Sequence, residues 1–337
     1  MRKRFLSIAM AASFAMLFNA QQIKFEEYDL PNGLHVILHQ DNSAPVVTTS
    51  VMYHVGAKDE AAGRTGFAHF FEHLLFEGTK NIKRGEWFKL VSSNGGSNNA
   101  NTSPDRTYYY ETFPSNNEQL GLWMEAERLR HPVINQIGVD TQREVVKEEK
   151  RLRMDNQPYG GLFNAILTTL FKKHPYKGTV IGSMEDLNSA KLEEFNAFFK
   201  KYYIPNNATL VVAGDIKPEQ TKKWINEYFG SIPKGTPITR NFPKETPITQ
   251  EFEETIYDAN IQIPAYIFAY RTPAAKERDA YILSMLGSYL SKGKSSVLYK
   301  KLVDNEKKAL AVEAFNLGLV DHSIFAFFAI PMGNTSK

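Results

Sequence analysis

Apolar residues recur along the chain in two rhythms, and each rhythm predicts its own kind of element. Short runs rich in β-branched and aromatic residues predict strands, whereas apolar positions three or four apart predict helices. The strands expected in the first part of the chain are 23–30, 34–39, 46–55, 107–113 and 208–213. The helices expected there are 65–76, 116–130, 139–155, 162–172, 190–203 and 218–229. Because strands and helices mix without regular βαβ alternation, we expect an α+β fold, with helices packed on a layered, antiparallel-rich sheet.

A proline-rich segment divides this pattern. Residues 233–250 carry four prolines between polar residues, which is typical of a linker. We therefore expect a first domain at 21–232 and a second at 251–337. The second contains expected strands at 261–270, 310–317 and 324–330 and expected helices at 279–290 and 295–303. This order repeats part of the first domain, so the second is expected to be a similar domain that is either abbreviated or incomplete.

The first residues predict a targeting segment. Arg2, Lys3 and Arg4 precede a short apolar run at 5–18, and Ala20 offers a small residue for cleavage. This pattern predicts a signal peptide at 1–20 and an exported protein, periplasmic or extracellular. An uncleaved anchor or a buried helix is the alternative. The run is too short for a comfortable membrane span and no later stretch is long enough, so we expect no stable span after signal removal.

Composition narrows the chemistry that the chain can perform. Its 40 basic and 37 acidic residues leave a formal net charge of +3, which gives no reason to expect nucleic acid or an anionic membrane as a partner. There is no cysteine, so disulfides and thiolate metal sites are excluded. Any metal must be held by histidine nitrogen and carboxylate oxygen.

The segment His69-Phe70-Phe71-Glu72-His73 carries the main chemical signal. On a helix, residues four apart lie about 40° from one another on one face, so His69 and His73 can share one tetrahedral ion. Glu72 lies at the edge of this pair, where a carboxylate can reach water on the metal. The alternative is that these polar residues lie on a solvated helix face. The residues around the motif are mostly Phe and Leu, which indicates a helix that is buried nearly all round. Two histidines and a glutamate in such a helix are best explained by metal ligation.

The third ligand is expected from the helix at 139–155. With Val145 as origin, Val146, Leu152 and Glu149 fall within one apolar stripe, whereas Glu148 lies at its edge. A carboxylate that points into a core is costly unless it is paired or bound to metal, which favours Glu149 as the ligand. Gln142, two turns earlier, is expected to hydrogen-bond a ligand from outside the coordination sphere.

These motifs resemble the inverted-motif zinc peptidases that include pitrilysin, insulin-degrading enzyme and mitochondrial processing peptidase. The resemblance rests mainly on HFFEHLLFEGTK and QREVVKEEKRLRMDNQPYG, and HPYKGTVIGSMEDL and NATLVVAGDI add to it. It implies that His69, His73 and Glu149 bind one Zn²⁺ and that Glu72 activates the water that attacks a peptide carbonyl. The ligand types alone would also admit other divalent transition metals.

The resemblance also implies how substrate and partners bind. The family holds a peptide substrate as an added strand, and SNGGSNNANTSPDRTYYY resembles the loop and edge strand used for this, with Asn99 and Ala100 as the contact positions. In the family, the second domain, which lacks a metal motif, often supplies an arginine and a tyrosine. Here these positions fall on Val303 and Val312.

Three functional hypotheses follow. The first is a zinc-dependent endopeptidase acting on peptides or unfolded segments, with Glu72 as general base. The second is a catalytic subunit that is active only with an arginine- and tyrosine-bearing partner, in a homo- or heterodimer with a homologous subunit. The third is a non-catalytic peptide-binding scaffold, against which the intact Glu72 argues.

Overall fold

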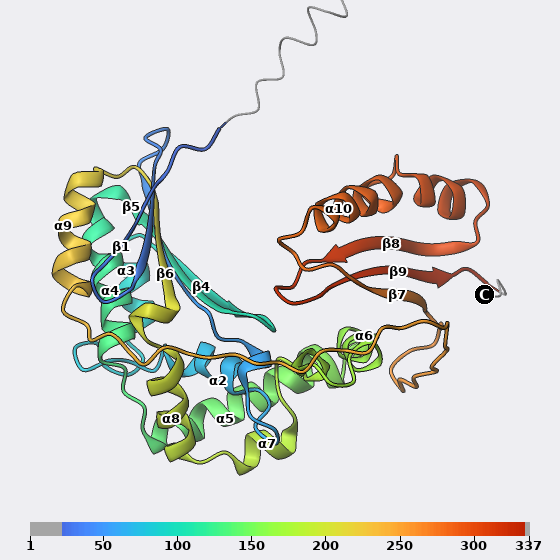
Figure 1. Ribbon diagram of the computed structural model, residues 1–337, viewed down its shortest axis with the longest axis horizontal. Helices are drawn as coiled ribbons and strands as arrows, with labels where there is room; N and C mark the ends of the chain where they lie inside the picture. Colours follow the sequence, from blue (N-terminus) through green and yellow to red (C-terminus); the bar gives the residue numbers. More distant parts are fainter. Residues whose placement is uncertain (1–21, 334–337) are drawn as a thin grey trace, which may run out of the picture.

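The computed structural model describes residues 22–333 and contains two sheets, each packed with helices (Figure 1). The first has six strands in the order β1-β2-β6-β3-β5-β4, and only the β2–β6 pair is parallel. The second has three antiparallel strands in the order β7-β9-β8. The expected α+β class with an antiparallel-rich sheet is confirmed. The expected signal peptide at 1–20 lies outside the described residues.

The elements follow the chain in this order. The strands are β1 (Glu26–Asp29), β2 (His35–Gln40), β3 (Val46–Tyr53), β4 (Ser97–Thr102), β5 (Thr107–Pro114), β6 (Ala208–Gly214), β7 (Tyr266–Thr272), β8 (Ala309–Leu317) and β9 (Ser323–Pro331). The main helices are α2 (Phe67–Leu74), α3 (Trp87–Ser93), α4 (Glu118–Arg130), α5 (Gln136–Lys150), α6 (Leu162–Leu170), α7 (Met184–Ser189), α8 (Leu192–Tyr202), α9 (Pro218–Phe229) and α10 (Arg278–Ser291). Shorter helical turns include η1 (Ala57–Asp59), η3 (Arg151–Asp155), η4 (Pro175–Lys177) and η6 (Tyr299–Asn305).

One face of the six-stranded sheet is covered by helices. Residues of β5 alternate between buried and half-buried, as expected for a strand with one covered face. On the covered face, Tyr109 donates its hydroxyl to the carbonyl oxygen of Phe71 in α2 (2.8 Å). Glu111 on the same face pairs with Arg128 of α4 (2.9 Å between Oε1 and Nη2). The metal-motif helix is therefore fixed to the sheet directly beside its edge.

Two expected helices differ from the structure for local reasons. The helix expected at 190–203 is α8, and the short helix α7 before it was not expected. Arg143 donates to the carbonyl oxygens of Leu187 and Ala190 and so satisfies the end of α7. The helix expected at 139–155 is α5 followed by a π-helical turn, η3, which begins two residues after the expected ligand Glu149. Such turns are frequent at functional sites.

The three-stranded sheet lies between α10 and α6 (Figure 1). Its inner face forms a separate hydrophobic core with α6 and η4, and this core joins segments from both expected domains. Its buried members are Ile166, Leu167, Leu170, Phe171, Tyr176, Leu319, Ile324 and Ala326. The second sheet is thus attached to the first part of the chain through α6.

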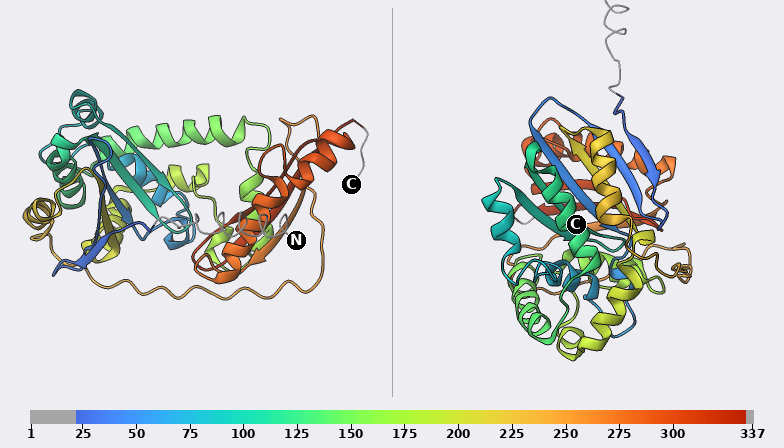
Figure 2. Two further views of the ribbon diagram at one scale, coloured as in Figure 1. Left: turned by 90° about the horizontal axis from the view of Figure 1, so that it is seen from above. Right: turned by 90° about the vertical axis from the view of Figure 1, so that its left-hand side faces the viewer.

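A long connection separates the two sheets. Residues 233–265 contain no helix or strand, and they run along one side of the molecule from α9 to β7 (Figure 2, left). We propose the division at 21–232, 233–250 and 251–337 on this ground, because β6 and α9 belong to the six-stranded sheet and its helices. Within 22–333 no helix has the length and apolar character needed to cross a membrane.

Candidate metal centre

The helix α2 begins at a tightly packed glycine. Gly66 has φ +90°, a conformation that favours glycine, and a Cβ there would lie 2.7 Å from the carbonyl oxygen of Ile181. The Glu60 carboxylate accepts hydrogen bonds from the amides of Gly66 (2.9 Å) and Ala68 (2.8 Å). The helix expected from residue 65 therefore has Gly66 as its N-cap, and the hydroxyl of Thr65 donates to Asp186 instead of capping α2. Glu60 from the segment just before the helix and the distant residues Ile181 and Asp186 thus fix where α2 begins.

Aromatic packing fixes the rotation of α2. Phe67, Phe70 and Phe71 are all fully or nearly fully buried, and each packs against Phe195 of α8, with ring centroids 4.6, 4.5 and 5.9 Å away. These rings occupy the faces that the histidines leave free. The helix therefore turns its two histidines toward α5.

His69, His73 and Glu149 meet between α2 and α5. Nε2 of His69 lies 3.5 Å from Oε2 of Glu149, and Nε2 of His73 lies 3.0 Å from the same oxygen. One ligand atom from each residue falls within 4.8 Å of the others. Nε2 of His73 and Oε2 of Glu149 are buried and have no hydrogen-bond partner among the described residues. Unsatisfied nitrogen and oxygen atoms converging on one point fit a bound zinc ion.

The protonation of these groups suits cation binding. Burial, and then the neighbouring His73, lower the pKa of His69 to about 4, so its imidazole is neutral at pH 7. Contact with the His73 ring comes first among the effects that lower the pKa of Glu149, and the Arg153 guanidinium adds to it. A neutral imidazole and an ionised carboxylate are the forms in which histidine and glutamate bind a metal.

Glu72 lies beside this group and has one oxygen occupied. Thr102, the last residue of β4, donates its hydroxyl to Oε2 of Glu72 at 2.7 Å. Burial raises the pKa of Glu72 in spite of this hydrogen bond. A buried carboxylate with a raised pKa is a stronger base than an exposed one, so Glu72 is suited to accept a proton from water.

A cavity of about 280 Å³ opens onto these residues. His69, Glu72 and Glu149 line it together with residues of β4, η3, α6 and the loop before α7. Of the expected substrate contacts, Ala100 lines the cavity, and Asn99 precedes it on β4, where its Oδ1 accepts from the Ala100 amide (2.9 Å). β4 is the outermost strand of its sheet, so one side of its backbone is unpaired by strands within 22–333.

Some expected positions differ in the structure. The amide of Gln142 donates to Oε1 of Glu77 (2.5 Å) and not to a ligand, because its side chain turns toward the end of α2. Val145 and Leu152, used to define the apolar stripe, are exposed. The buried side of α5 is centred on Val146 instead, and Glu149 still lies next to that side.

Two cavity residues were missed from the sequence. Nη1 of Arg153 lies 2.9 Å from Oε1 of Glu149, so the two oxygens of this carboxylate face different partners. The i, i+4 spacing of Glu149 and Arg153 was a signal for this pair. Asn164 of α6 has a buried Oδ1 without a hydrogen-bond partner among residues 22–333. Nothing in the sequence marked it.

The second sheet contributes no side chain to the lining of this cavity. Val312, one of the two positions where the family often has a polar residue, lines a different cavity between α10 and β8, and Val303 lies in η6. Any polar group that completes the site from a second domain would have to come from elsewhere.

Comparisons with known proteins agree with this geometry. The profile described as insulinase (peptidase family M16) matches residues 35–183, and that of the peptidase M16 inactive domain matches residues 189–333. Zinc protease PqqE of Helicobacter pylori is 34% identical over 311 residues, covering 91% of this chain and 70% of that protein. The probable mitochondrial-processing peptidase subunit beta of Arabidopsis thaliana is 25% identical over 342 residues, covering 97% of this chain and 64% of that protein. A crystal structure of a protease from Helicobacter pylori matches with a TM-score of 0.84 and 33% identity, covering 93% of this chain and 76% of that chain. The chain therefore belongs to peptidase family M16.

Proposed function

We propose that this chain is a zinc-dependent endopeptidase that hydrolyses peptides or unfolded protein segments. The observation that carries the proposal is the convergence of His69, His73 and Glu149, with Glu72 beside them in one cavity. The similarity to proteins named zinc proteases supports it.

In this proposal each residue of the site has a separate role in peptide hydrolysis. His69, His73 and Glu149 hold the zinc ion, which when bound polarises a water molecule and the scissile carbonyl group. Thr102 holds one oxygen of Glu72 and leaves the other for the water. Glu72 accepts the proton of the attacking water and passes it to the departing amine.

The edge strand β4 offers a place for the peptide backbone. An extended peptide can add to an unpaired strand edge through main-chain hydrogen bonds, with little dependence on its sequence. We propose Asn99 and Ala100 as contacts on this strand, where Ala100 already lines the cavity. The unpaired Oδ1 of Asn164, which lines the same cavity, is a further acceptor for a peptide amide.

A second form of the proposal is a subunit that needs a partner. The lining of the cavity by residues of the first 181 positions alone, with Val312 elsewhere, favours it. In this form a homologous subunit would supply the missing polar groups, in a homo- or heterodimer. The N-terminal pattern at 1–20 supports export to the periplasm or the cell exterior in either form.

The test is cleavage of an internally quenched, unstructured peptide by the purified chain, with bound zinc quantified in the same sample. We expect one zinc per chain and cleavage that a chelator abolishes and added zinc restores. One zinc without cleavage would favour the partner-dependent form. No retained zinc in the folded chain would contradict both forms.

Glu72→Gln separates catalysis from binding. This substitution keeps the shape and the contact with Thr102 but removes the base, so we expect cleavage to fall by at least about a hundredfold while zinc content and peptide binding persist. Glu149→Gln is the matched control, because it should lose zinc as well as cleavage. Activity that survived Glu72→Gln would contradict the mechanism, whereas the scaffold hypothesis predicts peptide binding without cleavage already in the unaltered chain.

A further inference from the structure

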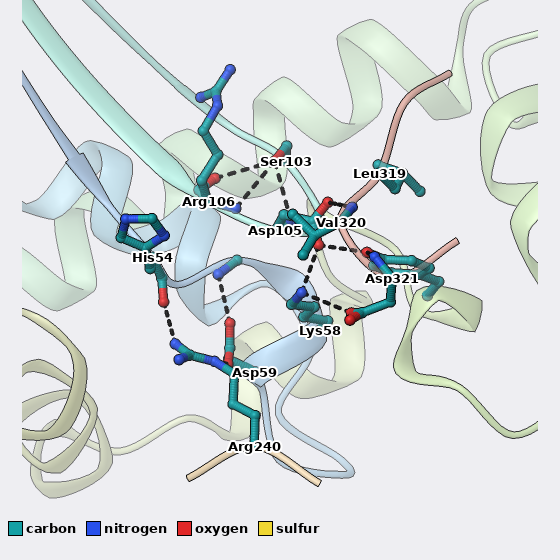
Figure 3. Close-up of polar contacts among 12 residues, drawn as sticks. His54, Lys58, Asp59, Ser103, Asp105, Arg106, Arg240, Leu319, Val320 and Asp321 are labelled. Carbon is teal, nitrogen blue, oxygen red and sulfur yellow. Dashed lines mark hydrogen bonds and ion pairs between the residues drawn. The ribbon is translucent and has the colours of Figure 1, made fainter. Parts of the chain in front are cut away.

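The loop between β8 and β9 reaches across to the first part of the chain. At the contact, Nζ of Lys58 lies 2.8 Å from Oδ1 of Asp105 and 2.8 Å from Oδ2 of Asp321 (Figure 3). Lys58 belongs to η1, and its side chain is only 6% exposed. One buried cation thus joins a carboxylate of the first domain to a carboxylate of the second.

Hydrogen bonds from neutral donors surround this ion triad. The amide of Val320 donates to Oδ2 of Asp105 at 2.9 Å. The hydroxyl of Tyr176 donates to Oδ1 of Asp105 at 2.5 Å, and it accepts from the amide of Asp321 at 3.0 Å. Both oxygens of Asp105 are therefore occupied, one by Lys58 and Tyr176 and the other by Val320 of the second domain.

Removing the cation from this site would be costly. A buried ion pair contributes little compared with an apolar replacement of the same shape, but deletion of one partner leaves uncompensated buried charge. Here deletion of Lys58 would leave two carboxylates facing one another, and Asp105 is 9% exposed. The expected response is separation of the two segments that carry the carboxylates.

The turn that carries Asp105 is also the turn that leads out of the edge strand. Residues 103–106 connect β4 to β5, and Thr102 immediately before them donates to Glu72. Two backbone hydrogen bonds join η1 to residues 103–106. The amides of Ala57 and Lys58 donate to the carbonyl oxygens of Ser103 (3.2 Å) and Pro104 (3.0 Å). Gly56 allows this approach, because a Cβ there would lie 2.4 Å from the Ser103 oxygen.

The linker, residues 233–250, also contacts η1. Nε of Arg240 lies 2.6 Å from Oδ1 of Asp59, and the Arg240 guanidinium also donates to the carbonyl oxygen of His54 (Figure 3). η1 is thus held by the linker through Asp59 and by the second domain through Lys58. Its position depends on both, and the position of residues 103–106 depends on η1.

We propose that Lys58 is a positioning residue that couples the second domain to the catalytic edge of the first. By holding residues 103–106 against the β8–β9 loop, Lys58 keeps Thr102 in contact with Glu72 and keeps β4 at the wall of the cavity. This inference rests on the proposed peptidase function for its effect on cleavage. Its structural part, the coupling of residues 103–106 to residues 318–322, does not.

Lys58→Met tests the inference, with Lys222→Met as the matched control. Nζ of Lys222 also lies 2.8 and 2.9 Å from two carboxylates, but all three residues belong to the first domain and lie nearer the surface. We expect Lys58→Met to speed amide hydrogen exchange at both 103–106 and 318–322 by about tenfold or more. In the same variant KM for the quenched peptide should rise and kcat fall, while zinc content stays unchanged. Lys222→Met should change none of these.

The rise in KM separates positioning from loss of folded protein, because a smaller active fraction lowers the apparent kcat but leaves KM unchanged. Lys58→Arg, which keeps the charge, should restore KM at least in part. If Lys58→Met does not fold, Asp321→Asn removes the charge from the more exposed side of the triad and should give the same pattern in weaker form.

Faster exchange at 318–322 alone, with 103–106 and KM unchanged, would overturn the inference. Unchanged exchange in both segments would overturn it as well. If the unaltered chain cleaves no peptide, the proposed function fails, and the exchange rates of the two segments still decide whether Lys58 couples them.

Discussion

At the scale of single residues, the two oxygens of Glu149 have different tasks. Oε2 faces both histidines, and Oε1 is held by Arg153. This division would keep the carboxylate in one orientation before any metal arrives. An outer contact of this kind commonly raises the affinity of a site for its metal.

Arg153→Gln should therefore weaken zinc binding, on the order of tenfold, as measured by competition with a chromophoric chelator. Because Arg153 is 76% exposed, high salt should reduce the difference from the unaltered chain. Arg151→Gln is the control, since Arg151 pairs with Glu148, which is not an expected ligand. Equal affinities for the two variants would contradict the role of Arg153.

Much of the candidate site could be predicted from residue types alone. His69, His73 and Glu149 are polar residues in apolar surroundings, and the structure brings their ligand atoms together, although their role as zinc ligands stays a prediction. Arg153 and Asn164 could not be found in this way, because an exposed arginine and a helical asparagine are common everywhere. Lys58 and Asp321 are 263 positions apart, so no local pattern could pair them.

At the scale of elements, the site depends on how α2 begins. The first amides of a helix need partners, and here a half-buried glutamate outside the helix accepts from them. Glu60 binds two of these amides at once, through Oε2 and Oε1. The orientation of the metal-motif helix is thus set from its N-terminal end as well as by its aromatic face.

Glu60→Ala should lower the free energy of unfolding by about 2 kcal/mol, because two backbone amides lose their acceptor. Urea denaturation of the metal-free protein measures this change without a contribution from zinc. Glu86→Ala is a suitable control, since Glu86 precedes α3 without making a side-chain cap. A similar loss in both variants would show that the cap contributes nothing specific.

The elements themselves were predicted well where the apolar period was long, and less well elsewhere. The strand β5 and the helix α9 lie where the sequence placed them. The helix α8 was predicted, but the short helix α7 before it was missed, because the hydrogen bonds of Arg143 that end α7 come from another helix. β7 begins at Tyr266, later than expected, since a strand start depends on its partner β9.

At the scale of the whole molecule, α6 contributes both to the cavity and to the hydrophobic core of the second sheet. One side of it faces the cavity through Phe163, Asn164 and Leu167, and its buried residues form the core under the second sheet. A change in that core should therefore reach the cavity through α6, although the second sheet contributes no lining residue.

Ile324→Ala and Ile225→Ala offer a matched comparison. Both isoleucines are buried, and each substitution should cost about 2–5 kcal/mol of stability. Ile324 belongs to the core that contains α6, whereas Ile225 of α9 belongs to the core of the first sheet. We expect KM to rise only in Ile324→Ala, measured at a temperature where both variants are folded. The same KM in both would show that α6 does not transmit the change.

The composition of β4 has a consequence for solubility. Its sequence, Ser-Asn-Asn-Ala-Asn-Thr, forms the outer strand of a six-stranded sheet without a single large apolar side chain. A free strand edge is a template for aggregation, and asparagine has a low preference for strands. An edge of this composition can form main-chain hydrogen bonds with another strand, but its small polar side chains add little to the stability of the pairing. The same choice of residues that leaves the edge open to a transient peptide also discourages two copies of the chain from joining permanently along it.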